Sequence, residues 1–392
     1  MDQLEFAPVR RRLCLFIPGF DPQPARRYRE IMRREGPKQA EISGYDLTLS
    51  GSDIPNAWIL NWSDGAEGCE TTVQVLGWSD LVHGSLEPSG LSLARGALKT
   101  AWLYVHSGAL SAMFRLRRGP VWVSLYPYAV YLAWWSVVSL AVAAAWAMLV
   151  WYLALTVTAV LLILQGSAFR QLDQVAYARY LLSDYVFWAR DEGAYPAPLA
   201  TRLASFSDTV AASLTRDTWD EVMVVGHSSG ACVAISVLAK ARRSLGEGRP
   251  VSLLTLGQVV PMLSLLPKAT QLRSDLHQLA MDQRLTWVDV TAPGDPCCFA
   301  LCDPVAVSGA GPAGSMTMIS AAFRKSLSPD RRRAMSWRFF RRHLQYLHAF
   351  DIPAHFDPYL TLAGPKHLSA LAARPSSPAR ITGSVLPSAV EQ

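Results

Sequence analysis

Charged residues disappear from one long stretch of the chain. Between Gly119 and Phe169 there is no Asp, Glu, Lys or Arg, and the stretch is rich in Trp, Tyr and aliphatic residues. A helix needs about 20 predominantly apolar residues to cross the hydrocarbon core of a bilayer, and this stretch is more than twice as long. It therefore predicts a transmembrane hairpin over 119–169, two spans joined by a tight turn near 142–148.

The residues that flank this stretch are basic on both sides. Arg115, Arg117 and Arg118 precede it, and Arg170 and Arg179 follow it. Positive flanks favour the cytoplasmic side of a membrane, so both ends of the hairpin are expected there. Two crossings also leave the chain before and after the hairpin on one side, where it can build a single sheet. A very hydrophobic hairpin buried in a soluble protein is the alternative.

Outside the hairpin, apolar runs alternate with helical patterns, which is typical of an α/β fold with a mostly parallel sheet flanked by helices. The runs typical of strands are 13–20, 45–49, 57–62, 71–76, 221–225, 251–257, 285–291 and 315–323. Helical patterns cover 24–35, 92–118, 171–192, 199–216, 231–245 and 269–281. The aromatic segment 171–192 fits either a helix at the membrane interface or an amphipathic helix on the sheet.

The chain divides accordingly into an N-terminal part (1–118), the hairpin (119–169), the remainder of the core (170–374) and a tail (375–392). The three short runs between 45 and 76 are separated by turn residues, so they predict a meander at one edge of the sheet. The tail is rich in Pro and Ser and is expected to be disordered.

One segment combines a buried strand, a sharp turn and a helix. The apolar strand 221–225 runs into Gly226-His227-Ser228-Ser229-Gly230, and a helix follows at once. This G-x-S-x-G turn in its strand–helix context resembles the α/β-hydrolase superfamily, at its lipase and esterase end. The resemblance covers the N-terminal strand and roughly residues 201 to the end. It implies that Ser228 is a nucleophile, whereas an ordinary Gly/Ser-rich turn is the alternative.

The same resemblance implies a catalytic acid and a histidine, in that order along the chain. The acid is expected just past the second strand after the nucleophile, where Asp295 lies; Asp289 and Asp303 remain alternatives. Two histidines fit the last position, His343 in His-Leu-Gln-Tyr and His355 in His-Phe-Asp-Pro-Tyr. The stretches FFRRHLQY (339–346) and FDPYLTLAGP resemble the C-terminal part of uncharacterised bacterial membrane-anchored hydrolases, which favours His343.

In this family a loop after an early strand supplies one backbone N–H of the oxyanion hole, and the residue after the nucleophile supplies the other. Those positions are Phe20, after Pro18-Gly19, and Ser229. His227, inside the turn, is expected to be structural or to line the substrate site. Residues 330–349 can also be read as one continuous helix, which leaves His343 on a surface.

Amino-acid composition indicates which binding partners the protein is expected to have. Only 17% of residues are charged and the formal net charge is +6, so an anionic lipid surface is favoured over nucleic acid. The Arg-rich, aromatic segment 331–342 is either part of such a surface or a solvated helix face. The six cysteines follow no zinc or disulfide spacing, and no cofactor motif is present, so no metal and no cofactor is expected.

Together these patterns predict a membrane-anchored serine hydrolase with its catalytic domain in the cytoplasm, on the inner membrane of a bacterium. Lipid or long-chain acyl esters are the expected substrates. An acyltransferase or thioesterase on the same scaffold is one alternative, and a membrane scaffold protein without catalysis is another.

Overall fold

An eight-stranded mixed sheet forms the centre of the protein, in a computed structural model that describes residues 7–86, 90–245, 249–353 and 356–386. The strands are β1 (Arg11–Ile17), β2 (Asp46–Gly51), β3 (Ala57–Ser63), β4 (Gly68–Val75), β5 (Glu221–His227), β6 (Val251–Leu256), β7 (Leu285–Thr291) and β8 (Thr317–Ser320), in the spatial order β2-β3-β4-β1-β5-β6-β7-β8. The β2–β3–β4 meander is antiparallel, as predicted, and all pairs from β4 to β8 are parallel. The α/β class is therefore confirmed.

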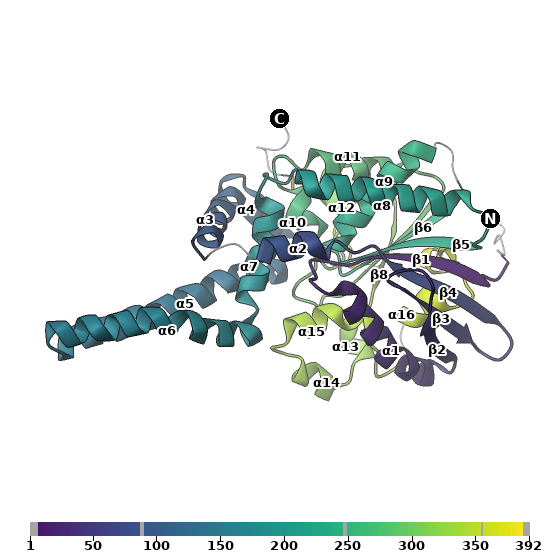
Figure 1. Cartoon of the computed structure of the whole chain (residues 1–392). Helices are drawn as coiled ribbons and strands as arrows, with labels where there is room; N and C mark the ends of the chain where they lie inside the picture. The colour runs from purple at the N-terminus through teal and green to yellow at the C-terminus, as the bar shows by residue number, and fades with distance from the viewer. Residues whose placement is uncertain (1–6, 87–89, 246–248, 354–355, 387–392) are drawn as a thin grey trace.

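Helices cover both faces of the sheet (Figure 1). Those of the first half of the chain are α1 (Pro24–Ser43), α2 (Ser79–Leu86), α3 (Gly90–His106), α4 (Ala109–Leu116), α5 (Arg118–Met148), α6 (Trp151–Ala176), α7 (Ala178–Ala189) and α8 (Ala197–Thr215). Those of the second half are α9 (Gly230–Leu245), α10 (Val260–Ser264), α11 (Thr270–Ala280), α12 (Pro304–Val307), α13 (Phe323–Ser326), α14 (Pro329–Ala334), α15 (Phe339–His343), the 3₁₀ helix η1 (Leu344–Leu347), α16 (Pro358–Ala363) and α17 (Leu368–Ala372).

The central strand β1 explains why two layers of helices are needed. Its apolar residues alternate between two separate buried clusters: Leu13 and Leu15 face the one, and Cys14 and Phe16 face the other. In Figure 1, α8, α9 and α11 lie on one side of the sheet, and α1 and α16 lie on the other. A strand with apolar residues on both faces must be covered on both.

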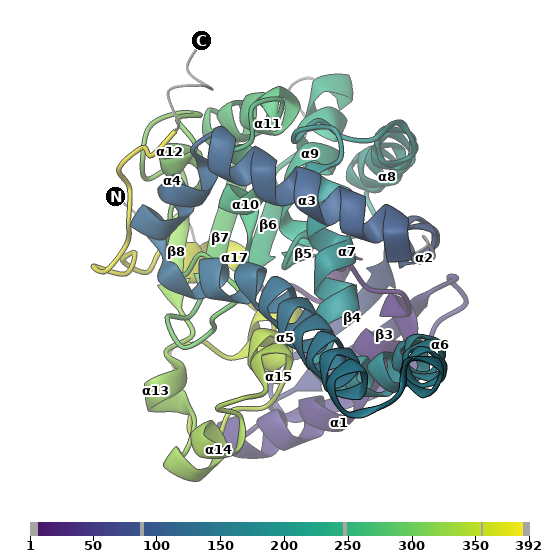
Figure 2. The same cartoon turned by 90° about the vertical axis from the view of Figure 1, so that its left-hand side faces the viewer.

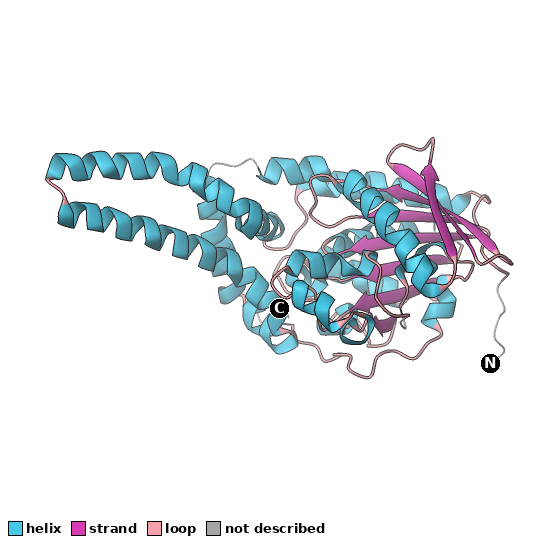
Figure 3. Ribbon diagram, turned by 90° about the horizontal axis from the view of Figure 1, so that it is seen from below, coloured by secondary structure: helices cyan, strands magenta, loops and turns pink. Residues whose placement is uncertain are grey.

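The charge-free stretch forms a long helical hairpin that projects away from the sheet (Figures 1 and 3). Its helices α5 and α6 are each long and apolar enough to cross a membrane. The chain turns at Leu149–Val150, later than the predicted 142–148, because no residue in that apolar run breaks the helix. The first turns of α5 belong to the core, where Pro120, Val121 and Val123 are buried.

The two alternatives for the aromatic segment 171–192 are decided by burial: Leu181, Tyr185 and Trp188 of α7 are buried in the core, as expected of an amphipathic helix covered by protein. Two other helical patterns differ from the structure. The stretch 92–118 is not one helix: it breaks at Gly108, which adopts φ +79°. Residues 330–349 likewise form α14, α15 and η1 rather than a continuous helix.

The tail is ordered up to its last described residue, contrary to the prediction. The N–H of Ile381 donates to Leu301 O (2.7 Å), and the N–H of Asp303 donates to Ile381 O (2.9 Å). Further along, the N–H of Val385 donates to Val307 O (3.1 Å). These backbone hydrogen bonds hold a segment of polar composition against the loop that follows β7, a contact that composition does not reveal.

A buried ion pair fastens the C-terminal segment to the amino ends of the central strands. Arg12 is fully buried, and its Nε lies 2.7 Å from Glu221 Oε2. The remaining guanidinium nitrogens donate to the carbonyls of Leu362, Gly364 and Lys366. An arginine carries five N–H donors in a fixed planar fork, so this one side chain can bind the carboxylate and all three carbonyl oxygens at once.

Candidate active site

Ser228 lies at the sharp turn between β5 and α9. Its φ is +60°, a conformation that non-glycine residues adopt only when the surroundings impose it. A Cβ on Gly230 would lie 2.3 Å from Ile17 O, and one on Gly226 would lie 2.7 Å from Ala231 Cα. Both glycines are therefore required for the turn to pack against β1 and α9, as the G-x-S-x-G pattern predicts.

Asp295 and His343 are brought together from distant parts of the chain. Asp295 lies in the loop after β7, and His343 is the last residue of α15. His343 Nδ1 is 2.7 Å from Asp295 Oδ2, and both side chains are buried. Because Nδ1 faces a carboxylate, it carries the proton, and Nε2 of the neutral ring is left as the basic nitrogen.

The carboxylate of Asp295 is held in its charged form. Tyr346 Oη donates to Oδ2 (3.0 Å) and the N–H of Cys297 donates to Oδ1 (2.9 Å). Burial alone would raise its pKa, but the adjacent His343 and the hydrogen bond from the N–H of Cys297 hold the pKa of Asp295 below its usual value. A buried acid that stays ionised beside an imidazole can stabilise the charged ring during proton transfer.

The two alternative acids are engaged elsewhere. Asp289 Oδ1 accepts from Thr255 Oγ1 (2.6 Å), and burial raises the pKa of Asp289 to about 7. Asp303 caps α12 by accepting from the N–H groups of Val305 and Ala306. Of the three predicted positions, only Asp295 is bonded to a histidine in the described part of the chain.

Of the two candidate histidines, His343 is described and His355 lies outside the described residues. His348 does not line the cavity that contains Ser228; its Nδ1 bonds Leu344 O (2.8 Å). His367 lies at the opposite end of the sheet, with Nδ1 3.9 Å from Glu221 Oε1.

Ser228 and His343 line one narrow cavity of about 80 Å³. Its other walls are largely apolar and come from α4, α5, α7, α10 and the loops after β6 and β7, with Met113, Val123, Leu181, Tyr185, Val259, Met262 and Phe299 among the lining residues. Asp184 of α7 also faces the cavity, and Trp188 Nε1 donates to its Oδ1 (2.9 Å). Burial raises the pKa of Asp184 to about 7 despite that hydrogen bond.

His227 connects the nucleophile turn to the helix that carries His343. Its Nε2 is 3.1 Å from His343 O, and its Nδ1 is 2.9 Å from Tyr28 Oη. A carbonyl only accepts, so Nε2 carries the proton and Nδ1 accepts from the tyrosine. Burial and the nearby His343 lower the pKa of His227 to about 3, which keeps it neutral. The sequence places His227 beside Ser228 but does not show that it positions the backbone of His343.

The loop after β1 reaches the nucleophile, as predicted, but the N–H of Phe20 already donates a hydrogen bond within the protein. A Cβ on Gly19 would lie 3.4 Å from Ser228 Oγ, so this loop closely approaches the hydroxyl. The N–H of Phe20 donates to Ser229 Oγ (3.1 Å). An oxyanion bound to Phe20 would therefore have to share or displace this hydrogen bond. Tyr180 of α7 donates to Phe20 O and packs edge-on to its ring.

Asp295, Cys297 and His343 also offer three ligand atoms within 4.8 Å of one another. Burial and the Asp295 carboxylate raise the pKa of the Cys297 thiol well above its usual value. Metal ions bind the thiolate form, and Nδ1 of His343 already bonds Asp295. The arrangement therefore fits a hydrogen-bonded pair better than a metal centre.

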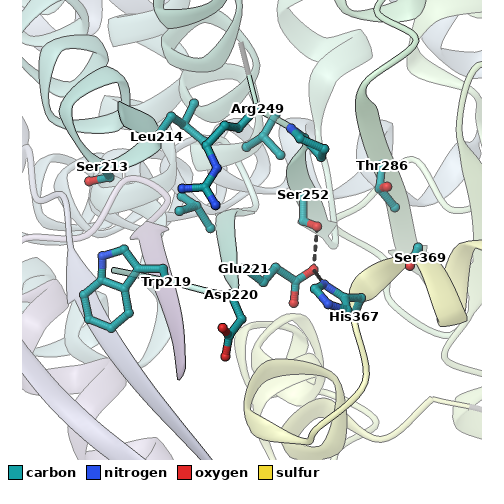
Figure 4. A pocket seen from close by; sticks show the side chains of 13 residues that line it. Ser213, Leu214, Trp219, Asp220, Glu221, Arg249, Ser252, Thr286, His367 and Ser369 are labelled. Atoms are coloured by element: carbon teal, nitrogen blue, oxygen red, sulfur yellow. Dashed lines mark hydrogen bonds and ion pairs between the residues drawn. The ribbon is translucent and has the colours of Figure 1, made fainter. Parts of the chain in front are cut away.

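A second cavity, of about 230 Å³, lies at the amino ends of β5, β6 and β7 (Figure 4). Glu221 points into it and bonds Ser252 Oγ (2.6 Å). The same carboxylate pairs with Arg12, so it is committed to holding the C-terminal segment. The candidate chemistry is at the other edge of the sheet, where β5 and β7 end.

No protein-family model matches the chain, and no curated protein or solved structure resembles it significantly.

Proposed function

We propose that the protein is a serine hydrolase of the α/β-hydrolase type. The observation that supports this most is the geometry at the carboxyl edge of the sheet: Ser228, held at φ +60°, shares a cavity with a histidine that is bonded to an ionised aspartate. The order nucleophile, acid, histidine along the chain is also that of the superfamily. Asp295 follows the second strand after the nucleophile, at the position that this order requires.

Each residue then has a defined role. Nε2 of His343 removes the proton from Ser228 as Oγ attacks an acyl carbonyl, and Asp295 stabilises the imidazolium that forms. The N–H groups of Ser229 and Phe20 donate hydrogen bonds to the oxyanion, the latter by giving up its bond to Ser229 Oγ. The imidazolium returns its proton to the leaving alcohol. Water, deprotonated by the same histidine, releases the acid and restores Ser228.

The walls of the cavity and the neighbouring hairpin point to the substrate class. Aliphatic and aromatic side chains outnumber the charged lining residues Asp21, Arg27 and Asp184, and this apolar majority favours an acyl chain in the cavity. Its walls include Pro120 and Val123, at the base of a helix that can span a membrane. Lipid or long-chain acyl esters are therefore the proposed substrates. The basic flanks of the hairpin support a cytoplasmic position for the catalytic domain, and the location that we propose is a bacterial inner membrane.

The test is covalent labelling of the full-length protein in membranes with a fluorescent fluorophosphonate. The natural chain should be labelled, Ser228→Ala should not, and His343→Ala should be labelled far more slowly. His355→Ala is the matched control, because it distinguishes the two candidate histidines and should label normally. If the natural chain stays unlabelled while folded, the hydrolase proposal is wrong and a non-catalytic membrane protein becomes the better hypothesis. Products formed with and without an added alcohol separate hydrolysis from acyl transfer.

A further inference from the structure

Helix α3 is apolar on two opposite faces. One face is buried against the domain and contains Leu93, Ala97, Thr100, Leu103 and Tyr104. The other face exposes large apolar side chains, with 61% of Leu91, 71% of Leu98, 61% of Trp102 and 65% of Val105 accessible. These four residues are spaced by seven, four and three positions, so they form one stripe along the helix. Soluble proteins rarely expose a contiguous apolar stripe of this kind, and such a stripe usually marks a contact with protein or membrane.

Basic side chains border this outer stripe. Arg95, Lys99 and His106 are exposed on α3 and, at 100° per residue, lie along one side of the stripe. Trp102 stacks on His106 with ring centroids 4.5 Å apart. Large apolar residues and tryptophan beside Lys and Arg are typical of helices that lie in the headgroup region of a bilayer.

The position of α3 relative to the hairpin is consistent with a location at the level of the lipid headgroups. Tyr128 Oη of α5 donates to Ala97 O (2.9 Å), and Tyr104 Oη donates to Met262 O (2.8 Å), so α3 is fixed both to the hairpin base and to the domain. From Leu132 to Met148 the exposed part of α5 then rises about 26 Å. The hydrocarbon core is about 30 Å thick, so α3 lies where the membrane span begins.

The orientation of α3 also fits a helix that lies in the plane of the membrane surface. Figure 2 looks at the end of the domain from which the hairpin projects, and α3 lies across that end in front of the sheet. Two neighbouring helices also expose large apolar side chains: Phe114 of α4 and Trp122 of α5 are exposed, and their rings pack edge-on at 6.1 Å.

We propose that α3 is an interfacial membrane helix, which lies in the bilayer surface beside the two spans through Leu91, Leu98, Trp102 and Val105. The occupant of this face is the lipid bilayer, because α3 is hydrogen-bonded to the base of the hairpin and its outer face is bordered by Arg95 and Lys99, whose charge matches anionic headgroups. The proposal rests on the hairpin crossing a bilayer and does not depend on hydrolase chemistry. It also puts the bilayer surface near the helices that form one wall of the cavity, since Met113 of α4 and Val123 of α5 line it.

The experiment measures where single spin labels lie in proteoliposomes that contain the full-length protein and anionic lipid. Labels are attached at Leu98→Cys, Trp102→Cys and Val105→Cys, with Asp217→Cys on the far side of the domain as the aqueous control; Asp217 is 95% exposed. The natural cysteines are buried except for Cys297, which is partly buried, and the chain without an added cysteine gives their background. Leu140→Cys reports whether the hairpin itself is embedded.

Labels on α3 should collide with oxygen more often, and with a water-soluble nickel complex less often, than the label at Asp217. Their depth should be shallower than that of the label at Leu140. Nickel access at α3 equal to that at Asp217, with Leu140 protected, would show that the face lies in water and would overturn the proposal. Protection from both reagents would mean that protein covers the face, and dipolar broadening between labels would then identify a second copy. Exposure of Leu140 as well would refute the spanning hairpin, a result distinct from any failure of fluorophosphonate labelling.

Discussion

Two aspartates lie six residues apart on β7 and in the loop that follows it, and replacing each by asparagine should have opposite consequences. Asp295 accepts three hydrogen bonds: from His343 Nδ1, from Tyr346 Oη and from the N–H of Cys297. An asparagine has one carbonyl oxygen, so its NH₂ must face at least one of these donors. If NH₂ faces Nδ1, the imidazole proton moves to Nε2, and the ring can no longer act as a base toward Ser228.

The size of the effect follows from the charge as well as from the geometry. In either amide orientation the negative charge that stabilises the imidazolium is lost. In a Ser-His-Asp triad this replacement lowers kcat by about 10⁴, which corresponds to about 5.5 kcal/mol of activation free energy. We expect a comparable loss in the rate of fluorophosphonate labelling for Asp295→Asn. Folding should be less affected, since the cost is about one buried hydrogen bond, or 1–3 kcal/mol, less the gain from burying a neutral group.

Asp289→Asn is the matched control. Asp289 is buried, its pKa is raised to about 7, and its Oδ2 has no hydrogen-bond partner among the described residues. The amide that replaces it can keep the bond from Thr255 Oγ1. Labelling by Asp289→Asn should therefore stay within a few-fold of the natural rate. Loss of labelling in Asp289→Asn, with near-normal labelling in folded Asp295→Asn, would refute the assignment of the acid.

Three further substitutions test other parts of the argument. Arg12→Met should lower the free energy of unfolding by about 3–5 kcal/mol in denaturant titrations, because it leaves the buried Glu221 carboxylate without its cation. Adding Glu221→Met should recover much of that loss. A double variant that is no more stable than Arg12→Met would contradict the ion-pair explanation. Asp184→Asn should raise thermal stability at pH 8 but not near pH 4: the pKa of Asp184 is raised from 3.8 to about 7 in the folded state, so its ionisation penalises folding increasingly as pH rises through that range. An equal effect at both pH values would show that ionisation is not the cause. His227→Phe should slow labelling of Ser228, because the backbone of His343 loses its hydrogen-bond donor, and should lower the free energy of unfolding by about 1–3 kcal/mol; an unchanged labelling rate would remove His227 from the site.

The features that depend on a short stretch of sequence were predicted correctly. The turn at Ser228 requires two glycines within five residues, and the hairpin requires only an absence of charge, so a short window of sequence suffices for each. The order of strands also predicted the loop that holds Asp295. The choice between Asp289 and Asp295 needed the structure, because it depends on which carboxylate meets a histidine about 50 residues further along the chain.

Contacts between distant segments were missed for the same reason. The aromatic pattern of α7 fitted both an interfacial helix and a helix covered by protein, and only the burial of Trp188 in the structure decides for the second. Helix α3 carries apolar residues on both faces, so no single stripe stands out in its sequence and its outer face was not predicted. The ordered tail depends on backbone hydrogen bonds such as that from Ile381 to Leu301, which side-chain composition cannot indicate.

The topology of the sheet explains why the candidate site and the hairpin lie at the same end of the molecule. The chain leaves the sheet at the carboxyl end of β4 and returns to it only at the amino end of β5. Because β4, β1 and β5 are parallel, an insertion that begins after β4 starts at the edge where the loops after β1 and β5 bring Phe20 and Ser228. Tyr180, just after α6, packs against Phe20 and against Phe340 of the helix that carries His343. The helix that follows the hairpin therefore contacts residues from two sides of the cavity, so that the path of the chain through α6 and α7 links the hairpin to the candidate site.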